Sequence, residues 1–185
     1  KVDGVDVRDM TQKELRDKLG YVPQKGVLFS GTIDSNIRYG KPEITDAQVK
    51  EAAEVAQATE FIDTKPEKYE SPVSQGGTNV SGGQKQRLSI ARAIAKDPEI
   101  FIFDDSFSAL DFKTDSQLRK ALKEYTKDAT TVIVAQRIST ILGADQIIVL
   151  DDGHMAGIGT HKELMANCEV YQQIARSQLS EEELA

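Results

Sequence analysis

The chain has 185 residues, of which 39 % are hydrophobic and 29 % are charged, a composition typical of one soluble α/β domain. The formal net charge of −7 argues against a face that binds nucleic acid, and the single cysteine, Cys168, excludes both an internal disulfide and a cysteine-based zinc site. No apolar stretch approaches the roughly 20 residues that a membrane-spanning helix needs.

The chain begins with "KVDGVDVRDM", a turn-and-strand pattern without a preceding capping element, so we expect the domain to start before Lys1. Three capping boxes then predict helix starts, because the hydroxyl and the later side chain of such a box satisfy unpaired backbone N–H groups. These boxes are Thr11-x-x-Glu14, Thr45-x-x-Gln48 and Thr160-x-x-Glu163. Apolar stripes predict helices over 46–58 and after Ser116.

Three short apolar runs predict strands: "EIFIF" at 99–103, "TTVIVA" at 130–135 and "QIIVL" at 146–150. Because the runs are continuous and do not alternate with polar residues, we expect strands buried on both faces, as in a parallel sheet covered by helices. Residues 23–95 carry helical patterns and no convincing strand. The predicted fold is therefore α/β, with a parallel-sheet core and an inserted helical subdomain.

The segment "NVSGGQKQRLSIARA" (79–93) places a serine and two glycines at the start of a predicted helix. Glycine permits close approach of the backbone, and the first turn of a helix has free N–H groups, so this turn suits a phosphate. A flexible turn with an ordinary N-cap is the alternative. The P-loop pattern GxxxxGK[ST] does not occur in these 185 residues.

A pair of carboxylates, Asp104 and Asp105, directly follows the predicted strand at 99–103. Open α/β sheets bind ligands at the carboxyl ends of their strands, and an Asp in this place holds Mg²⁺ in P-loop NTPases. The alternative is an acidic strand end that faces solvent.

Five motifs in order resemble the nucleotide-binding domain of an ATP-binding cassette (ABC) transporter, from the "VDG" turn to "GTHKEL" at 159–164. "YVPQ" resembles the Q-loop, "IFIFDD" the Walker B motif and "VIVAQRIST" the switch region. "VSGGQ" resembles the signature motif and "SALD" the D-loop. The nucleotide-binding residues that this resemblance implies are Gln24, Val80, Ser81, Gly82, Gly83, Gln84, Ser108 and Asp111.

The resemblance implies a P-loop NTPase-like domain, truncated at its N-terminus, that uses ATP and Mg²⁺. Its α/β core comprises 1–22 and 96–170, with the Q-loop and helical subdomain at 23–95 and a tail at 171–185. Asp104 and Gln24 are the implied metal ligands, and the "SEEELA" end is expected to be solvated. In this family two such domains pack head to tail, so the signature turn serves ATP held by a second nucleotide-binding domain.

Two departures from the family pattern affect the implied catalytic residues. Asp105 stands where the family usually has Glu, which draws the carboxylate back by about 1 Å, and misplacement on this scale can cost roughly a hundredfold in rate. Gln136 replaces the switch histidine and cannot carry a charge or shuttle a proton. Gln75 also stands where exporters usually have Glu. The pattern resembles the degenerate-site subunit of a heterodimeric exporter; a symmetric homodimer with low activity is the alternative.

Residues 27–40 resemble the stretch by which exporters contact their transmembrane domain. Val27, Leu28, Phe29 and Ile33 would supply this contact, although they could equally be core residues. The resemblance thus implies an ATPase at the cytoplasmic face of the cell membrane, attached through a transmembrane domain and without a nucleic-acid partner.

A non-enzymatic fragment or regulatory half-domain is the second reading, because the 185 residues lack the phosphate-binding P-loop. We expect these residues alone to be inactive and marginally stable as a monomer. His154, His161 and Cys168 lack the spacing or the neighbours of metal ligands and nucleophiles.

Overall fold

The computed structural model describes residues 1–180, which fall into two compact units that meet in sequence at Val134 and Ala135. Residues 181–185, which include most of the predicted solvated tail, lie outside the described residues. Among the described helices, none combines the length and the apolar character needed to cross a membrane.

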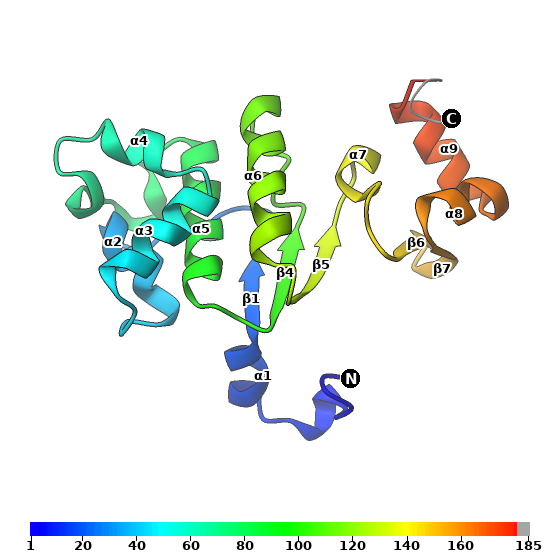
Figure 1. Ribbon diagram of the computed structural model, residues 1–185, viewed down its shortest axis with the longest axis horizontal. Helices are drawn as coiled ribbons and strands as arrows, with labels where there is room; N and C mark the ends of the chain where they lie inside the picture. Colours follow the sequence, from blue (N-terminus) through cyan, green and yellow to red (C-terminus); the bar gives the residue numbers. More distant parts are fainter. Residues whose placement is uncertain (181–185) are drawn as a thin grey trace. The chain divides into compact units, whose positions relative to one another are not determined.

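The sheet of the first unit has three parallel strands in the order β1-β4-β5 (Figure 1). They are β1 (Leu19–Val22), β4 (Ile100–Asp104) and β5 (Thr130–Val134). Gly20 pairs with Phe101, and Phe101 pairs with Thr131. The α/β fold and the strands expected from "EIFIF" and "TTVIVA" are therefore confirmed.

Burial on both faces was expected of the strands at 99–103 and 130–135, and this expectation is wrong for β5; strand β1 itself was not predicted. Phe101 and Phe103 of β4 are buried, whereas the side chains of Tyr21, Val132 and Val134 are about half exposed. Within the described residues, the strands therefore alternate between a covered and an exposed face.

Helix α5 (Gly82–Ala95) is the central helix of the first unit and contacts β1. The short helix α2 (Ile33–Ile37) and helix α3 (Asp46–Val55) pack against it, and α4 (Thr59–Asp63) follows α3. Leu88, Ile90 and Ile94 of α5 are fully buried in the shared core. In Figure 1 these helices form one group beside the sheet.

Helix α6 (Phe112–Tyr125) covers β4, because the ring of Tyr125 meets the Phe101 ring edge-on at 6.5 Å. Leu118 and Leu122 from the predicted apolar stripe are buried in the same core.

The three predicted capping boxes are all formed, at α1 (Gln12–Lys18), α3 and α8 (His161–Asn167). The helix expected over 46–58 ends earlier, at Val55, because Gln57 adopts a left-handed φ of 55°. Two further boxes start α2 and α5, through Thr32 and Ser81.

Short elements complete the first unit, and two of them are strands in a region where none was convincing from the sequence. Strands β2 and β3 pair antiparallel within 23–95 and contain only two residues each, too few to leave a sequence pattern. These elements are η1 (Val7–Asp9), β2 (Gly31–Thr32), η2 (Arg38–Gly40), η3 (Lys68–Glu70), β3 (Pro72–Val73) and η4 (Gln75–Gly77).

The second unit contains an antiparallel hairpin of β6 (Ile147–Asp151) and β7 (His154–Gly159). The strand expected at 146–150 is present as β6, but it pairs antiparallel with β7, so the expected parallel pairing is wrong. Asp152 and Gly153 at the turn both have positive φ, at 45° and 77°, as a two-residue type I′ hairpin requires.

Helices α7 (Ile138–Ile141), α8 and α9 (Glu169–Gln178) surround a small core in this unit. His161 Nδ1 lies 2.8 Å from the Tyr171 hydroxyl, which links α8 to α9, and Cys168 is buried. Position 171, the expected start of the tail, lies inside α9. The division into core, helical subdomain and tail remains a prediction.

Val22→Ala is expected to lower the free energy of unfolding by about 1.5–3 kcal/mol, because Val22 is fully buried where β1 meets the core. Val134→Ala is the matched control: it loses the same methyl groups and the same strand propensity at a side chain that is 52 % exposed. Urea denaturation of the two variants measures the difference. Equal losses would contradict the assignment of Val22 to the core.

Candidate functional site

The carboxyl ends of β1 and β4 bring together four polar side chains. The Tyr21 hydroxyl donates a hydrogen bond to Asp104 Oδ2 at 3.1 Å, and Gln24 Nε2 donates to Asp105 Oδ2 at 3.1 Å. Because β1 and β4 are neighbouring parallel strands, residues that follow each strand arrive at the same edge of the sheet. Gln24 and Asp105, 81 residues apart in sequence, thus become direct partners.

The backbone at Asp105 has the left-handed φ of 42°, a conformation that Asp tolerates better than most residues. Its N–H donates to the Val134 carbonyl at 2.8 Å, and its carbonyl accepts from the Ser108 hydroxyl at 2.9 Å. The buried Ser106 hydroxyl donates to the Val22 carbonyl at 2.9 Å and ties the end of β4 to the end of β1. These hydrogen bonds therefore fix the backbone that carries Asp104 and Asp105.

The hydrogen bond to Asp104 raises the pKa of the Tyr21 phenol, because the bond requires the phenol proton; the nearby negative charge acts in the same direction. At Asp111 the shift is opposite: donation from the Thr114 hydroxyl and N–H lowers the pKa of the carboxyl. Asp111 thereby caps α6, accepting from the Thr114 N–H at 2.9 Å.

The Ser81-Gly82-Gly83 turn stands at the N-terminus of α5, with Ser81 and Gly82 exposed. The Ser81 hydroxyl accepts from the Gln84 N–H at 3.2 Å, and the Gln84 side chain accepts from the Ser81 N–H at 3.1 Å. The N-cap expected as the alternative is thus present. Half-buried Val80 packs against the core before this turn.

One property distinguishes this box from three others in the chain. In the boxes of Thr11, Thr45 and Thr160, the hydroxyl also donates to the later Glu or Gln side chain. The Ser81 hydroxyl donates to no group among residues 1–180, so its proton is available to an external acceptor.

The two glycines leave room for an approaching ligand and for a neighbouring loop. A Cβ at Gly82 would meet no atom within 4 Å, whereas a Cβ at Gly83 would lie 3.5 Å from the Ala109 carbonyl oxygen. The start of α5 therefore has open space at Gly82 and is closely approached by the 108–111 segment at Gly83.

Asp104, Asp105 and Gln24 form a donor set that suits Mg²⁺ only in part. Mg²⁺ prefers oxygen ligands, keeps several waters and takes one or two carboxylates together with substrate phosphates. Among residues 1–180, no group of three or more His, Cys, Asp or Glu side chains could hold a metal ion. The site fits a cation that a nucleotide helps to bind and does not fit a free-standing metal centre.

Two further predicted positions are Gln136 and Gln75. Gln136 belongs to the second unit, where its side chain is exposed and its carbonyl accepts from Gln178 Nε2 at 2.8 Å. Gln75 is exposed in η4.

The expected contact surface at 27–40 is only partly as predicted. Leu28 and Ile33 are buried in the core, so their expected outward role is wrong, whereas Val27 and Phe29 are exposed. Tyr39, which the sequence reasoning missed, stacks on Phe29 with ring centroids 4.1 Å apart. Tyr21 and Ser106 were also missed: Tyr21 stands within the quoted "YVPQ", but its contact with Asp104 depends on strand pairing.

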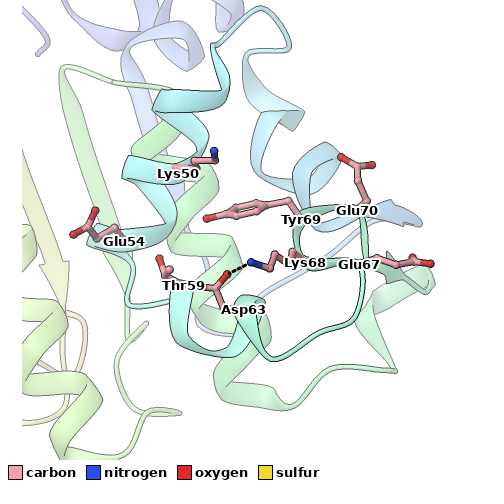
Figure 2. Close-up of a pocket in the computed structure, with 8 residues that line it drawn as sticks. All are labelled: Lys50, Glu54, Thr59, Asp63, Glu67, Lys68, Tyr69 and Glu70. Carbon is pink, nitrogen blue, oxygen red and sulfur yellow. Dashed lines mark ion pairs between the residues drawn. The ribbon is translucent and has the colours of Figure 1, made fainter.

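A separate hollow of about 520 Å³ lies among α3, α4 and η3 (Figure 2). Its charges are mixed, with Lys68 paired to Asp63 at 3.4 Å, and burial raises the pKa of Tyr69. It is lined by Lys50, Glu54, Thr59, Asp63, Glu67, Lys68, Tyr69 and Glu70. None of the predicted site residues contributes to it.

Comparison with known proteins identifies relatives for nearly the whole chain. Residues 1–108 match the protein family described as ABC transporter. An uncharacterised ABC transporter ATP-binding protein of Mycobacterium tuberculosis is 47 % identical over 180 residues, which are 96 % of this chain and 31 % of that protein. A Staphylococcus aureus protein assigned as a multidrug export ATP-binding/permease protein is 44 % identical over 173 residues, or 94 % and 30 %.

Among solved structures, a bacterial Atm1-family ABC exporter with ATP bound is similar, with a TM-score of 0.92 and 40 % sequence identity. The similarity covers 97 % of this chain and 32 % of that chain. The chain thus spans about a third of the length of the relatives that it matches.

We predict that the raised pKa of Tyr21 returns toward its ordinary value in Asp104→Asn, because a neutral amide oxygen accepts the phenol hydrogen bond more weakly than a carboxylate and carries no negative charge. NMR titration of tyrosine labelled at the phenol carbon measures this shift. Asp105→Asn is the control and should leave the Tyr21 pKa unchanged, since Asp105 pairs with Gln24. An unchanged pKa in Asp104→Asn would exclude the Tyr21–Asp104 contact.

Proposed function

The chain belongs to the ABC transporter family, and we propose from this that it serves as the ATP-binding and ATP-hydrolysing part of a transporter that exports its substrate. The single observation that carries the proposal is the exposed Ser81-Gly82-Gly83 turn at the start of α5, with an uncommitted hydroxyl proton and open space at Gly82.

The chemistry of this turn suits the terminal phosphate of ATP held by another domain. The free N–H groups of a helix start and the Ser81 hydroxyl neutralise phosphate oxygens without a lysine. The proposed acceptor is therefore ATP bound to the P-loop of a second nucleotide-binding domain, whose contact with this chain includes Ser108 and Asp111.

The carboxylate edge has a different proposed role, toward the nucleotide of this chain's own half-site. Asp104 and Gln24 would hold Mg²⁺, which would supply positive charge against the phosphate groups of the nucleotide. Gln24 also donates to Asp105 at 3.1 Å. The proposed metal ligand is therefore hydrogen-bonded to the residue that we propose orients the attacking water.

This half-site is proposed to be degenerate. The Asp105 carboxylate is one methylene shorter than a glutamate and is already engaged by Gln24, and Gln136 supplies an amide instead of an imidazole. We infer a heterodimer in which the partner domain supplies the competent glutamate and histidine, while Ser81, Gly82 and Gly83 complete the partner's site.

The proposed membrane contact uses Val27, Phe29 and Tyr39, which we call the aromatic surface. These side chains are 51 %, 39 % and 58 % exposed, and the two rings are stacked. We propose that this surface contacts a transmembrane domain at the cytoplasmic face of the membrane. The name of the Staphylococcus aureus relative, which joins ATP-binding and permease functions in one protein, supports this part of the proposal.

Ser81→Arg in the full-length protein, assembled with its partner, is expected to lower ATP turnover by about 10²–10³-fold, the loss typical of removing one preorganised donor to a developing oxyanion. Ser81→Asp separates this effect from folding: Asp keeps the helix cap, so stability is retained, but its charge repels phosphate. Phosphate release measures turnover.

Ser116→Arg is the matched control, since Ser116 is exposed on α6 and outside the site; it should leave turnover unchanged. Full turnover in both Ser81 variants would contradict the proposed function and favour a non-enzymatic half-domain.

Asp105→Asn is expected to reduce steady-state turnover by less than about twofold, because a carboxylate misplaced by roughly 1 Å already contributes little to the rate. Phosphate release by the assembled protein again measures turnover. The reciprocal test combines Asp105→Glu with Gln136→His, and this double variant should have a higher turnover. A loss of tenfold or more in Asp105→Asn would contradict the degenerate site and leave the ATPase assignment intact.

A further inference from the structure

Arg92 on α5 is the centre of a set of contacts with the 27–40 segment. Its Nη1 donates to the Val27 carbonyl at 2.8 Å, its Nε donates to the Asn36 carbonyl at 2.8 Å, and its Nη2 donates to Asn36 Oδ1 at 2.9 Å. The same guanidinium lies 5.1 Å from the Phe29 ring centroid and 5.5 Å from that of Tyr39. One side chain therefore contacts all three members of the aromatic surface.

Asn36 completes this arrangement from within α2. It is 1 % exposed and accepts from the Phe29 N–H at 2.8 Å, while its amide donates to the Phe29 and Thr32 carbonyls at 2.9 Å each. Arg92 and Asn36 together satisfy the backbone of the loop, so the positions of Phe29 and Tyr39 depend on this pair of polar side chains.

The charge of Arg92, like that of Arg87 on the same helix, is compensated by carbonyl oxygens and an aromatic face and not by a carboxylate. Arg92 forms no ion pair within residues 1–180, whereas Arg38 and Arg119 pair with aspartates. Burial lowers its pKa. Removing the Arg92 guanidinium from water costs free energy, which the hydrogen bonds to oxygen atoms and the contacts with two ring faces offset.

The second feature of Arg92 is its place on the same helix as the Ser81-Gly82-Gly83 turn. Arg92 follows Gly82 by ten positions, which correspond to roughly 15 Å along the helix at 1.5 Å per residue. Helix α5 is continuous over Gly82–Ala95, and its buried side chains lie between Gln86 and Ala95, so the exposed turn at its start and Arg92 belong to one unbroken helix.

We propose that Arg92 is the positioning residue that transmits movement of the Ser81 end of α5 to the aromatic surface. When a nucleotide draws the Ser81-Gly82-Gly83 turn, α5 moves, and the guanidinium carries the Val27 and Asn36 carbonyls and the two rings with it. The inference rests on the proposed function, since it requires a nucleotide at Ser81 and a docking partner at the aromatic surface.

The geometry explains why the residue is arginine. A planar guanidinium donates in three fixed directions and presents flat faces to aromatic rings, whereas a lysine ammonium is a single flexible point charge. Arg92→Lys should therefore keep the positive charge but lose the hydrogen bonds and ring contacts that join α5 to the aromatic surface. A purely electrostatic role of Arg92 would survive this substitution.

The test uses a cysteine reporter in the full-length, otherwise cysteine-free protein assembled with its partner. Val27→Cys places a thiol at an exposed side chain and keeps the carbonyl that Arg92 contacts. The maleimide-labelling rate at position 27 is measured with and without Mg-ATP and orthovanadate. We expect a change of at least about fivefold, the low end of typical couplings between sites.

Arg92→Gln and Arg92→Lys should each abolish that change while nucleotide binding is retained. Lys96→Gln is the matched control: Lys96 is the C-cap residue that follows α5, and it donates to the Arg16 and Leu19 carbonyls and not to the aromatic surface. It should lower stability and leave the ATP-dependent labelling change intact. If Arg92→Gln fails to fold, Arg92→Lys alone decides.

The inference is overturned if the ATP-dependent labelling change persists in the Arg92 variants. It is also overturned if the reporter protein with Arg92 intact shows no labelling change while Ser81→Arg still abolishes turnover. The proposed function fails in a different way, when turnover is insensitive to Ser81. The two failures are therefore distinguishable.

Discussion

The burial of helix α5 is the constraint on which the rest of the structure depends. Its apolar side contacts β1, α2 and α3, and Leu88, Ile90 and Ile94 are fully removed from water, each worth about 1.5–3 kcal/mol. Because the helix is fixed along its length, both of its ends have defined surroundings. The N-terminus presents Ser81 and Gly82 to solvent, and the C-terminal half presents Arg92 to the 27–40 loop.

The parallel pairing of β1 with β4 makes the second half of the site. Residues that follow two neighbouring parallel strands meet at one edge, and here this rule brings Gln24 to Asp105 and Tyr21 to Asp104. The buried Ser106 hydroxyl joins the two strand ends through the Val22 carbonyl. The left-handed φ of Asp105 turns the chain out of the sheet directly after the carboxylates.

Much of this arrangement follows from local sequence, and the rest depends on pairing that is invisible locally. The capping boxes and the strand at 99–103 are predictable because they use contacts three or four residues apart and a continuous apolar run. The strand at 146–150 was wrongly joined to the parallel sheet, although the Asp152-Gly153 turn favours a hairpin. Leu28 and Ile33 differ from Val27 and Phe29 in burial because of the packing of α2 on α5, which no pattern within 27–40 encodes.

The Ser81 box caps α5 and still leaves the serine hydroxyl proton without an acceptor among residues 1–180. A serine hydroxyl has one donor and two acceptor positions, and the helix cap uses only an acceptor position, toward the Gln84 N–H. At Thr11, Thr45 and Thr160 the donor is also consumed, by a carboxylate or amide oxygen of the same helix. At Ser81 it is left for an oxygen from outside. The phosphate that we propose for this turn would therefore gain a hydrogen bond from Ser81 without displacing the helix cap.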